Sequence, residues 1–124
     1  MGEPYRVRPS AADRLRADTV VHIVAMTTGI SALEIDSTDR SDRSVCWARR
    51  LAYYLGHIAF GWPMERVAHA FGRNRTTISV ACRLVEDARS DQQLDRALAE
   101  VEAAIRRVET LSSLDHVVPN WAAS

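Results

Sequence analysis

Apolar residues recur at three- and four-residue steps along most of the chain, which is the period of an amphipathic helix. The pattern is clearest in the segment 44–60. Its apolar face would consist of Val45, Ala48, Leu51, Ala52, Leu55, Ile58 and Ala59. Only five glycines and four prolines interrupt the chain, so long stretches contain no helix breaker. The pattern therefore predicts an all-α fold.

We expect about six helices, over residues 11–28, 31–35, 44–60, 63–71, 75–88 and 92–111, with the fifth beginning at Arg75 or Thr76. Gly29 suits a left-handed helix end, and Ser31 with Glu34 has the spacing of a capping box. Pro63 can be the first residue of the fourth helix. The positions expected to face the core outside the third helix are Leu15, Val20, Ile23, Val24, Met64, Val67, Ala70, Phe71, Ile78, Ala81, Cys82 and Val85.

The last predicted helix carries apolar residues at alternating four- and three-residue steps, the spacing of a coiled-coil seam. They are Leu94, Leu98, Val101, Ile105 and Val108. Because two heptads are short for a stable coiled coil, we expect this seam to pack on the domain's own core rather than on a second chain. Residues 11–111 then form one domain, preceded by an N-terminal arm at 1–10 and followed by a flexible tail at 112–124.

The formal net charge is zero, with sixteen basic and sixteen acidic residues, and this balance alone argues against a nucleic-acid partner. The charge is unevenly distributed, however. The segment 40–83 carries eight arginines against two acidic residues, while 1–39 and 86–115 are net acidic. All sixteen basic residues are arginines, whose planar fork matches phosphate and guanine, although codon bias in a GC-rich genome also produces this composition. An anionic partner for the middle segment is plausible, and solvated helix faces are the alternative.

Several kinds of chemistry have no support in the residues. Without lysine the chain cannot carry a phosphate-binding loop of the Gly-Lys-Ser/Thr type. The four histidines and two cysteines show no metal-ligand spacing, and two cysteines do not make a disulfide framework. No run is long and apolar enough for a membrane helix, and the N-terminus has no signal-peptide core. We therefore expect a cytoplasmic protein that is not an enzyme and needs no cofactor or metal.

The segment 63–88 has the arrangement of a helix-turn-helix: a short helix, a turn containing glycine, and a second helix. Arginine and asparagine can pair with guanine and adenine edges, and threonine can contact phosphate or a thymine methyl. The second helix would present these groups at its start: Arg73, Asn74, Arg75, Thr76, Thr77 and Ser79. The pattern favours binding to double-stranded DNA over a generic helical hairpin.

The run Phe71-Gly72-Arg73-Asn74-Arg75-Thr76-Thr77-Ile78 and its continuation Ala81-Cys82-Arg83 resemble the signature of the C-terminal DNA-binding domain of the bacterial replication initiator DnaA. Weaker similarity extends over residues 15–112. The resemblance implies an all-α domain in which the residues 73–77 read the major groove. It also implies a basic loop that enters the minor groove through Arg40 or Arg43, with Arg49 and Arg50 near phosphate.

The chain departs from the family pattern at positions that matter for recognition. One glycine of the family's pair is missing, and the family's Asp-His stands here as Asn74-Arg75, so the target sequence need not be the initiator's own box. Asp39 and Asp42 weaken the basic loop. We also expect no nucleotide-driven origin melting, because the sequence has no segment for the family's ATPase domain.

The preferred interpretation is a sequence-specific transcription regulator associated with the nucleoid, since similar modules occur in activators of phage-derived and gene-transfer-agent genes. Its partners would be double-stranded DNA and either the transcription machinery or another regulator. One alternative is a replication regulator that occupies initiator boxes at the origin. Another is a protein-interaction module without DNA binding, suggested by the acidic last helix and Trp121.

Overall fold

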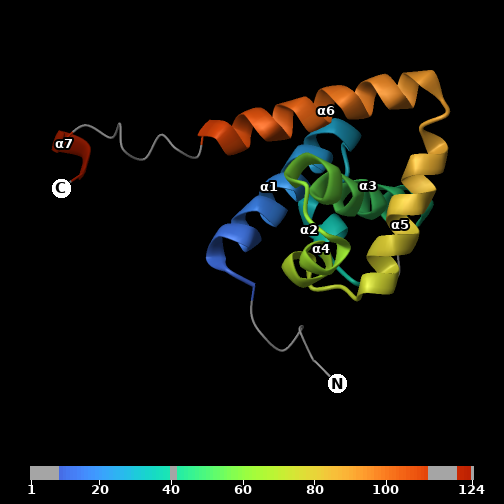
Figure 1. Cartoon of the computed structure of the whole chain (residues 1–124), viewed down its shortest axis with the longest axis horizontal. Coiled ribbons are helices and arrows are strands. Elements are labelled where there is room, and N and C mark those ends of the chain that lie inside the picture. Colours follow the sequence, from blue (N-terminus) through green and yellow to red (C-terminus); the bar gives the residue numbers. More distant parts are fainter. Residues whose placement is uncertain (1–8, 40–41, 112–119, 124) are drawn as a thin grey trace.

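The computed structural model describes residues 9–39, 42–111 and 120–123. Across these residues the chain forms helices and no strand, which confirms the all-α prediction (Figure 1). The helices are α1 (Ala11–Thr28), α2 (Ala32–Asp36), α3 (Arg43–Phe60), α4 (Met64–Phe71), α5 (Arg75–Ala88), α6 (Gln92–Leu111) and α7 (Asn120–Ala123). None of these helices is both long and apolar enough to cross a membrane.

Helix α3 lies at the centre of the domain, and α1, α2, α4, α5 and α6 all pack against it (Figure 1). Its middle turns are therefore buried on every side, not only on the predicted face. Tyr53 and Tyr54 are 4% and 2% exposed, and Gly56 is also buried. The Cβ of any larger residue at Gly56 would lie 3.0 Å from the Phe71 ring, so this glycine lets α4 approach α3 closely. The central helix thus fixes the position of α4 and α5 together.

The seam of α6 packs on the domain's own core, as predicted. Leu98 and Ile105 are buried, and Leu94 and Val101 are partly buried against the same core. Val108, at the end of the seam, is 45% exposed. The core prediction for α1 is wrong at Leu15, which is 67% exposed, because the buried face of α1 is formed by Ala17, Val20, Val21 and Val24.

Two local predictions need correction. The Ser31 hydroxyl accepts from the Leu33 amide at 3.1 Å, one residue before the amide that a capping box uses. Pro63 flanks α4 in extended conformation, and the helix begins one residue later. Trp62, between α3 and α4, is buried at 4% exposure and was not among the predicted core positions.

The predicted arm and tail fall mostly outside the described residues. Of the arm, Ser10 is described and caps α1 by accepting from the Asp13 amide at 3.1 Å. Of the tail, residues 120–123 form the short helix α7.

Candidate nucleic-acid interface

Helices α4 and α5 form a helix-turn-helix joined by a tight turn at residues 72–74. Gly72 has a φ of 68°, a left-handed conformation that favours glycine, and the Arg73 amide donates to the Ala68 carbonyl at 2.9 Å. This hydrogen bond and the left-handed Gly72 end α4 and turn the chain directly into α5.

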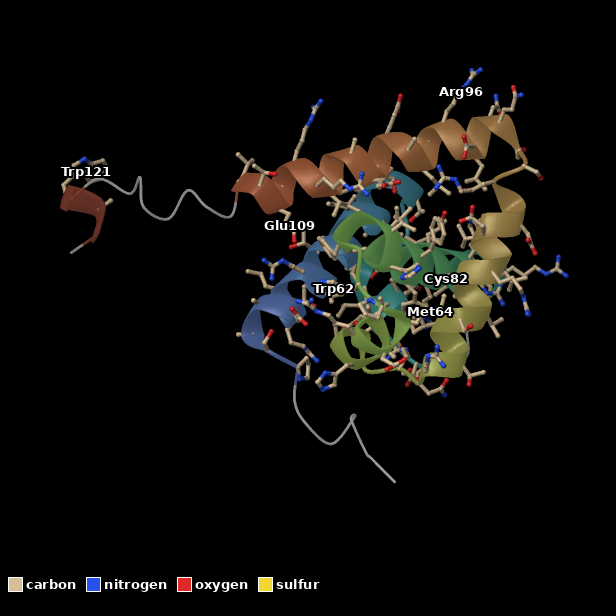
Figure 2. The ribbon with its side chains drawn as sticks, in the orientation of Figure 1. Trp62, Met64, Cys82, Arg96, Glu109 and Trp121 are labelled. Atoms are coloured by element: carbon tan, nitrogen blue, oxygen red, sulfur yellow. The ribbon has the colours of Figure 1, made fainter. Side chains whose placement is uncertain are left out.

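One face of α5 is anchored on the core, and this fixes the opposite face toward solvent. Ile78, Ala81, Cys82 and Val85 are all buried, as the spacing predicted. Figure 2 shows Cys82 on the side of α5 that faces the centre of the domain. Burial in this apolar environment raises the pKa of the Cys82 thiol to about 11.

The predicted reading residues at the start of α5 lie on the solvent side. Asn74, Arg75, Thr76, Thr77 and Ser79 are all exposed. Asn74 is the N-cap: its Oδ1 accepts from the Thr77 amide at 2.8 Å. Arg75 Nε lies 3.2 Å from Glu65 Oε1, and both side chains are more than 60% exposed, so water screens this ion pair strongly.

Beside the start of α5 lies an open groove of about 580 Å³. It is lined by the loop after α2, by α3, and by the turn before α5 together with the side of α5 that carries Thr76, Thr77, Val80 and Ala81. The lining residues are Ser37, Thr38, Cys46, Arg49, Arg50, Tyr53, Arg73, Asn74, Thr76, Thr77, Val80 and Ala81. The groove therefore brings together residues 49, 50, 73, 74, 76 and 77, six of the ten positions selected from the sequence.

Arg73, in the turn before α5, lines this groove, and its guanidinium is engaged within the protein. Its Nε donates to the Tyr53 hydroxyl at 2.8 Å, and Nη2 donates to the Asp36 carbonyl at 3.0 Å. Further bonds run from Nη1 to the Phe71 and Gly72 carbonyls and from Nη2 to the Ser37 carbonyl. The major-groove role predicted for this arginine would require breaking these bonds.

Arg49 is engaged in the same way. Its Nε and Nη2 donate to the Glu34 carbonyl at 3.2 and 2.8 Å, and Nε also donates to the Ile35 carbonyl at 3.2 Å. Its Nη1 donates to the Asp39 carbonyl at 3.1 Å. The phosphate role predicted for this arginine would require breaking these bonds.

The remaining predicted arginines differ in position. Arg50 is half-buried and lines the groove, and Arg43 is exposed in the first turn of α3, whose N-cap is Asp42. Arg40 lies outside the described residues. Ser79 is exposed but does not line the groove.

Sequence reasoning did not select the other six groove residues, which are Ser37, Thr38, Cys46, Tyr53, Val80 and Ala81. For two of them, helical spacing offered a signal. Val80 is 38% exposed and follows Thr76 and Thr77 by four and three positions, so helical spacing alone places it on their face. Cys46 is half-buried and precedes Arg50 by four positions on α3, which is the same kind of signal.

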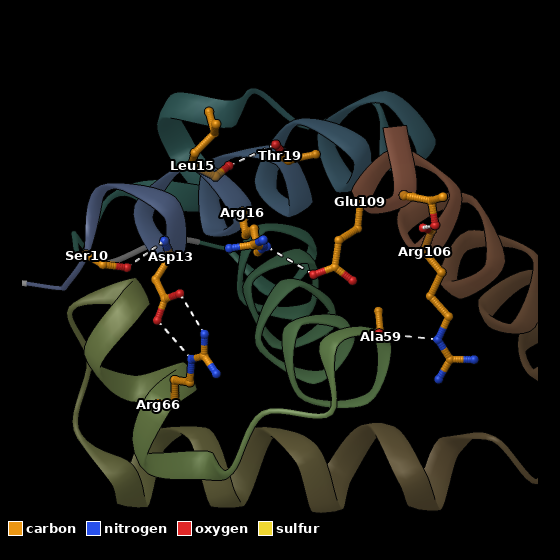
Figure 3. A network of polar contacts seen from close by, with 10 residues as sticks. Ser10, Asp13, Leu15, Arg16, Thr19, Ala59, Arg66, Arg106 and Glu109 are labelled. Carbon is orange, nitrogen blue, oxygen red and sulfur yellow. Dashed lines mark hydrogen bonds and ion pairs between the residues drawn. The ribbon is translucent and has the colours of Figure 1, made fainter. Parts of the chain in front are cut away.

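Polar contacts join α1 to α4 and to α6 (Figure 3). Arg66 donates to both carboxylate oxygens of Asp13 at 2.9 Å and stacks 4.5 Å from the centre of the Trp62 ring. The hydrogen bonds from Arg66 hold the pKa of Asp13 below its usual value. Arg16 pairs with Glu109 at 3.0 Å, which joins α1 to α6. These contacts, together with the core, set the orientation of the helix-turn-helix.

The described residues bring together no group of three or more histidine, cysteine, aspartate or glutamate side chains that could hold a metal ion.

Comparisons with known proteins agree with the helix-turn-helix formed by α4 and α5. A crystal structure described as a DNA replication initiation factor superposes on the chain with a TM-score of 0.67 at 24% sequence identity. The match covers 77% of this chain and 29% of that one, so it shows a shared fold over a minor part of the larger protein. No curated protein matches the chain. The family model for the bacterial DnaA protein helix-turn-helix matches residues 17–85, which is more than half of the chain. The chain therefore belongs to the bacterial DnaA helix-turn-helix family.

Proposed function

We propose that the chain binds double-stranded DNA in a sequence-specific manner and acts as a transcription regulator. The observation that carries the proposal is the start of α5, where a family-matched helix-turn-helix exposes Arg75, Thr76 and Thr77 beside an open groove. Helix N-termini also present free amides and a positive dipole end, which favour phosphate.

Each side chain then has a distinct role. Arg75, Thr76 and Thr77 contact base edges in the major groove, and Arg75 exchanges its solvent-exposed pair with Glu65 for a contact to DNA. The amide nitrogen of Asn74 remains available for a base acceptor while its oxygen caps the helix. Arg43 reaches the adjacent minor groove, and Arg50 and Ser79 contact the backbone.

Selection from a library of random DNA duplexes tests the proposal, and Arg75→Ala tests the assigned site. We expect the substitution to weaken binding to the selected duplex by about 1–3 kcal/mol. Arg96→Ala is the matched control, since Arg96 is exposed on α6 and points away from the domain (Figure 2). Equal affinity of both variants and the parent would remove Arg75 from the reading site.

Salt dependence separates DNA binding from a purely protein-binding role. A protein that neutralises three or four phosphates loses affinity with a log–log slope of roughly −3 to −4 against salt concentration. A protein-interaction module would select no duplex even at low salt.

Genome-wide binding then distinguishes two kinds of regulator. Enrichment at promoters, including those of phage-derived or gene-transfer-agent genes, supports transcriptional control. Enrichment at origin boxes supports a replication regulator instead. No comparison favours the replication role for this chain, which spans only 29% of the matched initiation factor.

A further inference from the structure

We infer that Arg49 and Arg73 are positioning residues that hold the two walls of the DNA groove at a fixed separation, rather than residues that contact DNA. This inference rests on the proposed function, because it assigns how the same groove is held in shape. It concerns the short helix α2 and the loop that follows it.

Helix α2 cannot hold its own position. It has five residues, and a helix leaves its last four carbonyl groups without internal partners. The Ser37 amide serves the carbonyls of Leu33 and Glu34, which leaves those of Ile35 and Asp36 to donors outside the helix. Isolated helices of this length are unstable in water. Something outside α2 must therefore satisfy its C-terminal end.

The two guanidiniums supply those donors. Arg49, from α3, bonds the carbonyls of Glu34, Ile35 and Asp39. Arg73, from the turn before α5, bonds the carbonyls of Asp36 and Ser37. Five carbonyl groups within residues 34–39 thus accept from two positive charges, which also suit the negative end of a helix dipole. We call this arrangement the arginine clamp.

The clamp connects both walls of the groove. One wall is the loop containing Ser37 and Thr38, and the other is the start of α5, which follows Arg73 directly. Arg73 is itself held by the hydroxyl of Tyr53, whose ring lies edge-on to Phe71 at 5.3 Å. The end of α2, at Asp36 and Ser37, is therefore tied to the same buried aromatic pair that supports the helix-turn-helix.

The distance between the loop after α2 and the start of α5 matters for DNA binding. A protein that reads the major groove with one element and the adjacent minor groove with another needs a fixed distance between them. Loosening the clamp leaves the α5 side chains intact, so base preference stays the same, while simultaneous contact from the loop is lost and affinity falls at every site.

The test uses Arg49→Lys and Arg73→Lys in the full chain, with Arg96→Lys as the control. Lysine keeps the charge but cannot reproduce the planar fork that serves several carbonyls. We expect each clamp variant to bind the selected duplex about tenfold more weakly, with unchanged base preferences across a duplex library. Arg96→Lys should equal the parent.

Amide hydrogen exchange tests the clamp without DNA. The amides of Ile35 and Ser37 donate to carbonyls at the start of α2, at 3.1 and 3.0 Å, and their exchange should accelerate in both clamp variants. Tyr53→Phe, which removes one bond to Arg73 and keeps the ring, should show the same changes more weakly. It serves as the milder variant if a lysine variant fails to fold.

Three outcomes would overturn the inference. Loss of preference at a single base pair in Arg73→Lys would make Arg73 a reading residue. Full affinity in both lysine variants would show that the clamp is not needed. Unchanged amide exchange at Ile35 and Ser37 in the clamp variants would show that the clamp does not hold α2. Because this measurement uses no DNA, it tests the clamp separately from the proposed function, also in the case that the parent protein selects no duplex.

Discussion

Replacing Ile105 with alanine tests whether the seam of α6 belongs to this domain's core. Ile105 is 1% exposed, so the substitution removes the buried carbon atoms Cγ1, Cγ2 and Cδ1. At about 0.8 kcal/mol for each buried methylene, the lost transfer free energy is roughly 2.4 kcal/mol. An incompletely closed cavity brings the expected loss of unfolding free energy to about 3 kcal/mol.

Urea unfolding followed by circular dichroism measures this loss, and thermal unfolding should show a Tm lower by roughly 10 °C. Val108→Ala is the control on the same seam, since Val108 is 45% exposed and its truncation should cost less than about 1 kcal/mol. Equal losses at the two positions would refute the reasoning. A loss at Ile105 that depends on protein concentration would indicate that the seam packs on a second chain.

Three further predictions follow from single contacts. In the native protein a thiol reagent at pH 8 should label Cys46 and leave Cys82 unreacted until unfolding, since burial raises the pKa of Cys82 to about 11. Asp13→Asn should cost at most about 1 kcal/mol at neutral pH, because Arg66 is about half exposed. The folded pKa of Asp13 is lowered, so its contribution is present above the unfolded pKa and lost as pH falls through the folded pKa; urea unfolding of parent and variant should converge at acid pH. Asn74→Ala should lower stability by about 1 kcal/mol through loss of the cap, while Asn74→Ser retains it; equal stability of the two variants in urea would contradict the capping role.

The helices could be predicted from the sequence because most of them bury one face. On α5 the spacing of Ile78, Ala81, Cys82 and Val85 alone identified the buried side. On α3 the same reasoning failed for Tyr53 and Tyr54, because a helix surrounded by five others has no solvent face in its middle turns. The spacing of apolar residues identifies a buried helix face only where the opposite face is in water, so it does not identify the buried residues of a helix that is covered on all sides.

The location of the candidate interface could be predicted from the sequence, but the contacts of its arginines could not. The exposed start of α5 follows from helix spacing and the positions of the turn residues. The engagement of Arg49 and Arg73 does not, since most of their partners are backbone carbonyls, which every residue carries and which leave no mark in a sequence. Only the fold places the end of α2 within reach of both side chains.

The positive charge of residues 40–83 is therefore only partly available to a ligand, because some of its arginines already bind groups of the protein. Of the eight arginines in residues 40–83, Arg49 and Arg73 serve backbone carbonyls and Arg66 pairs with Asp13. Their hydrogen-bonding groups are directed into the protein, where they stabilise the fold without reaching a ligand. The formal charge of +6 consequently overstates the number of contacts available to DNA. If the chain binds DNA as proposed, we expect few phosphate contacts and weak nonspecific binding, so that a larger share of the affinity would come from base contacts at the start of α5.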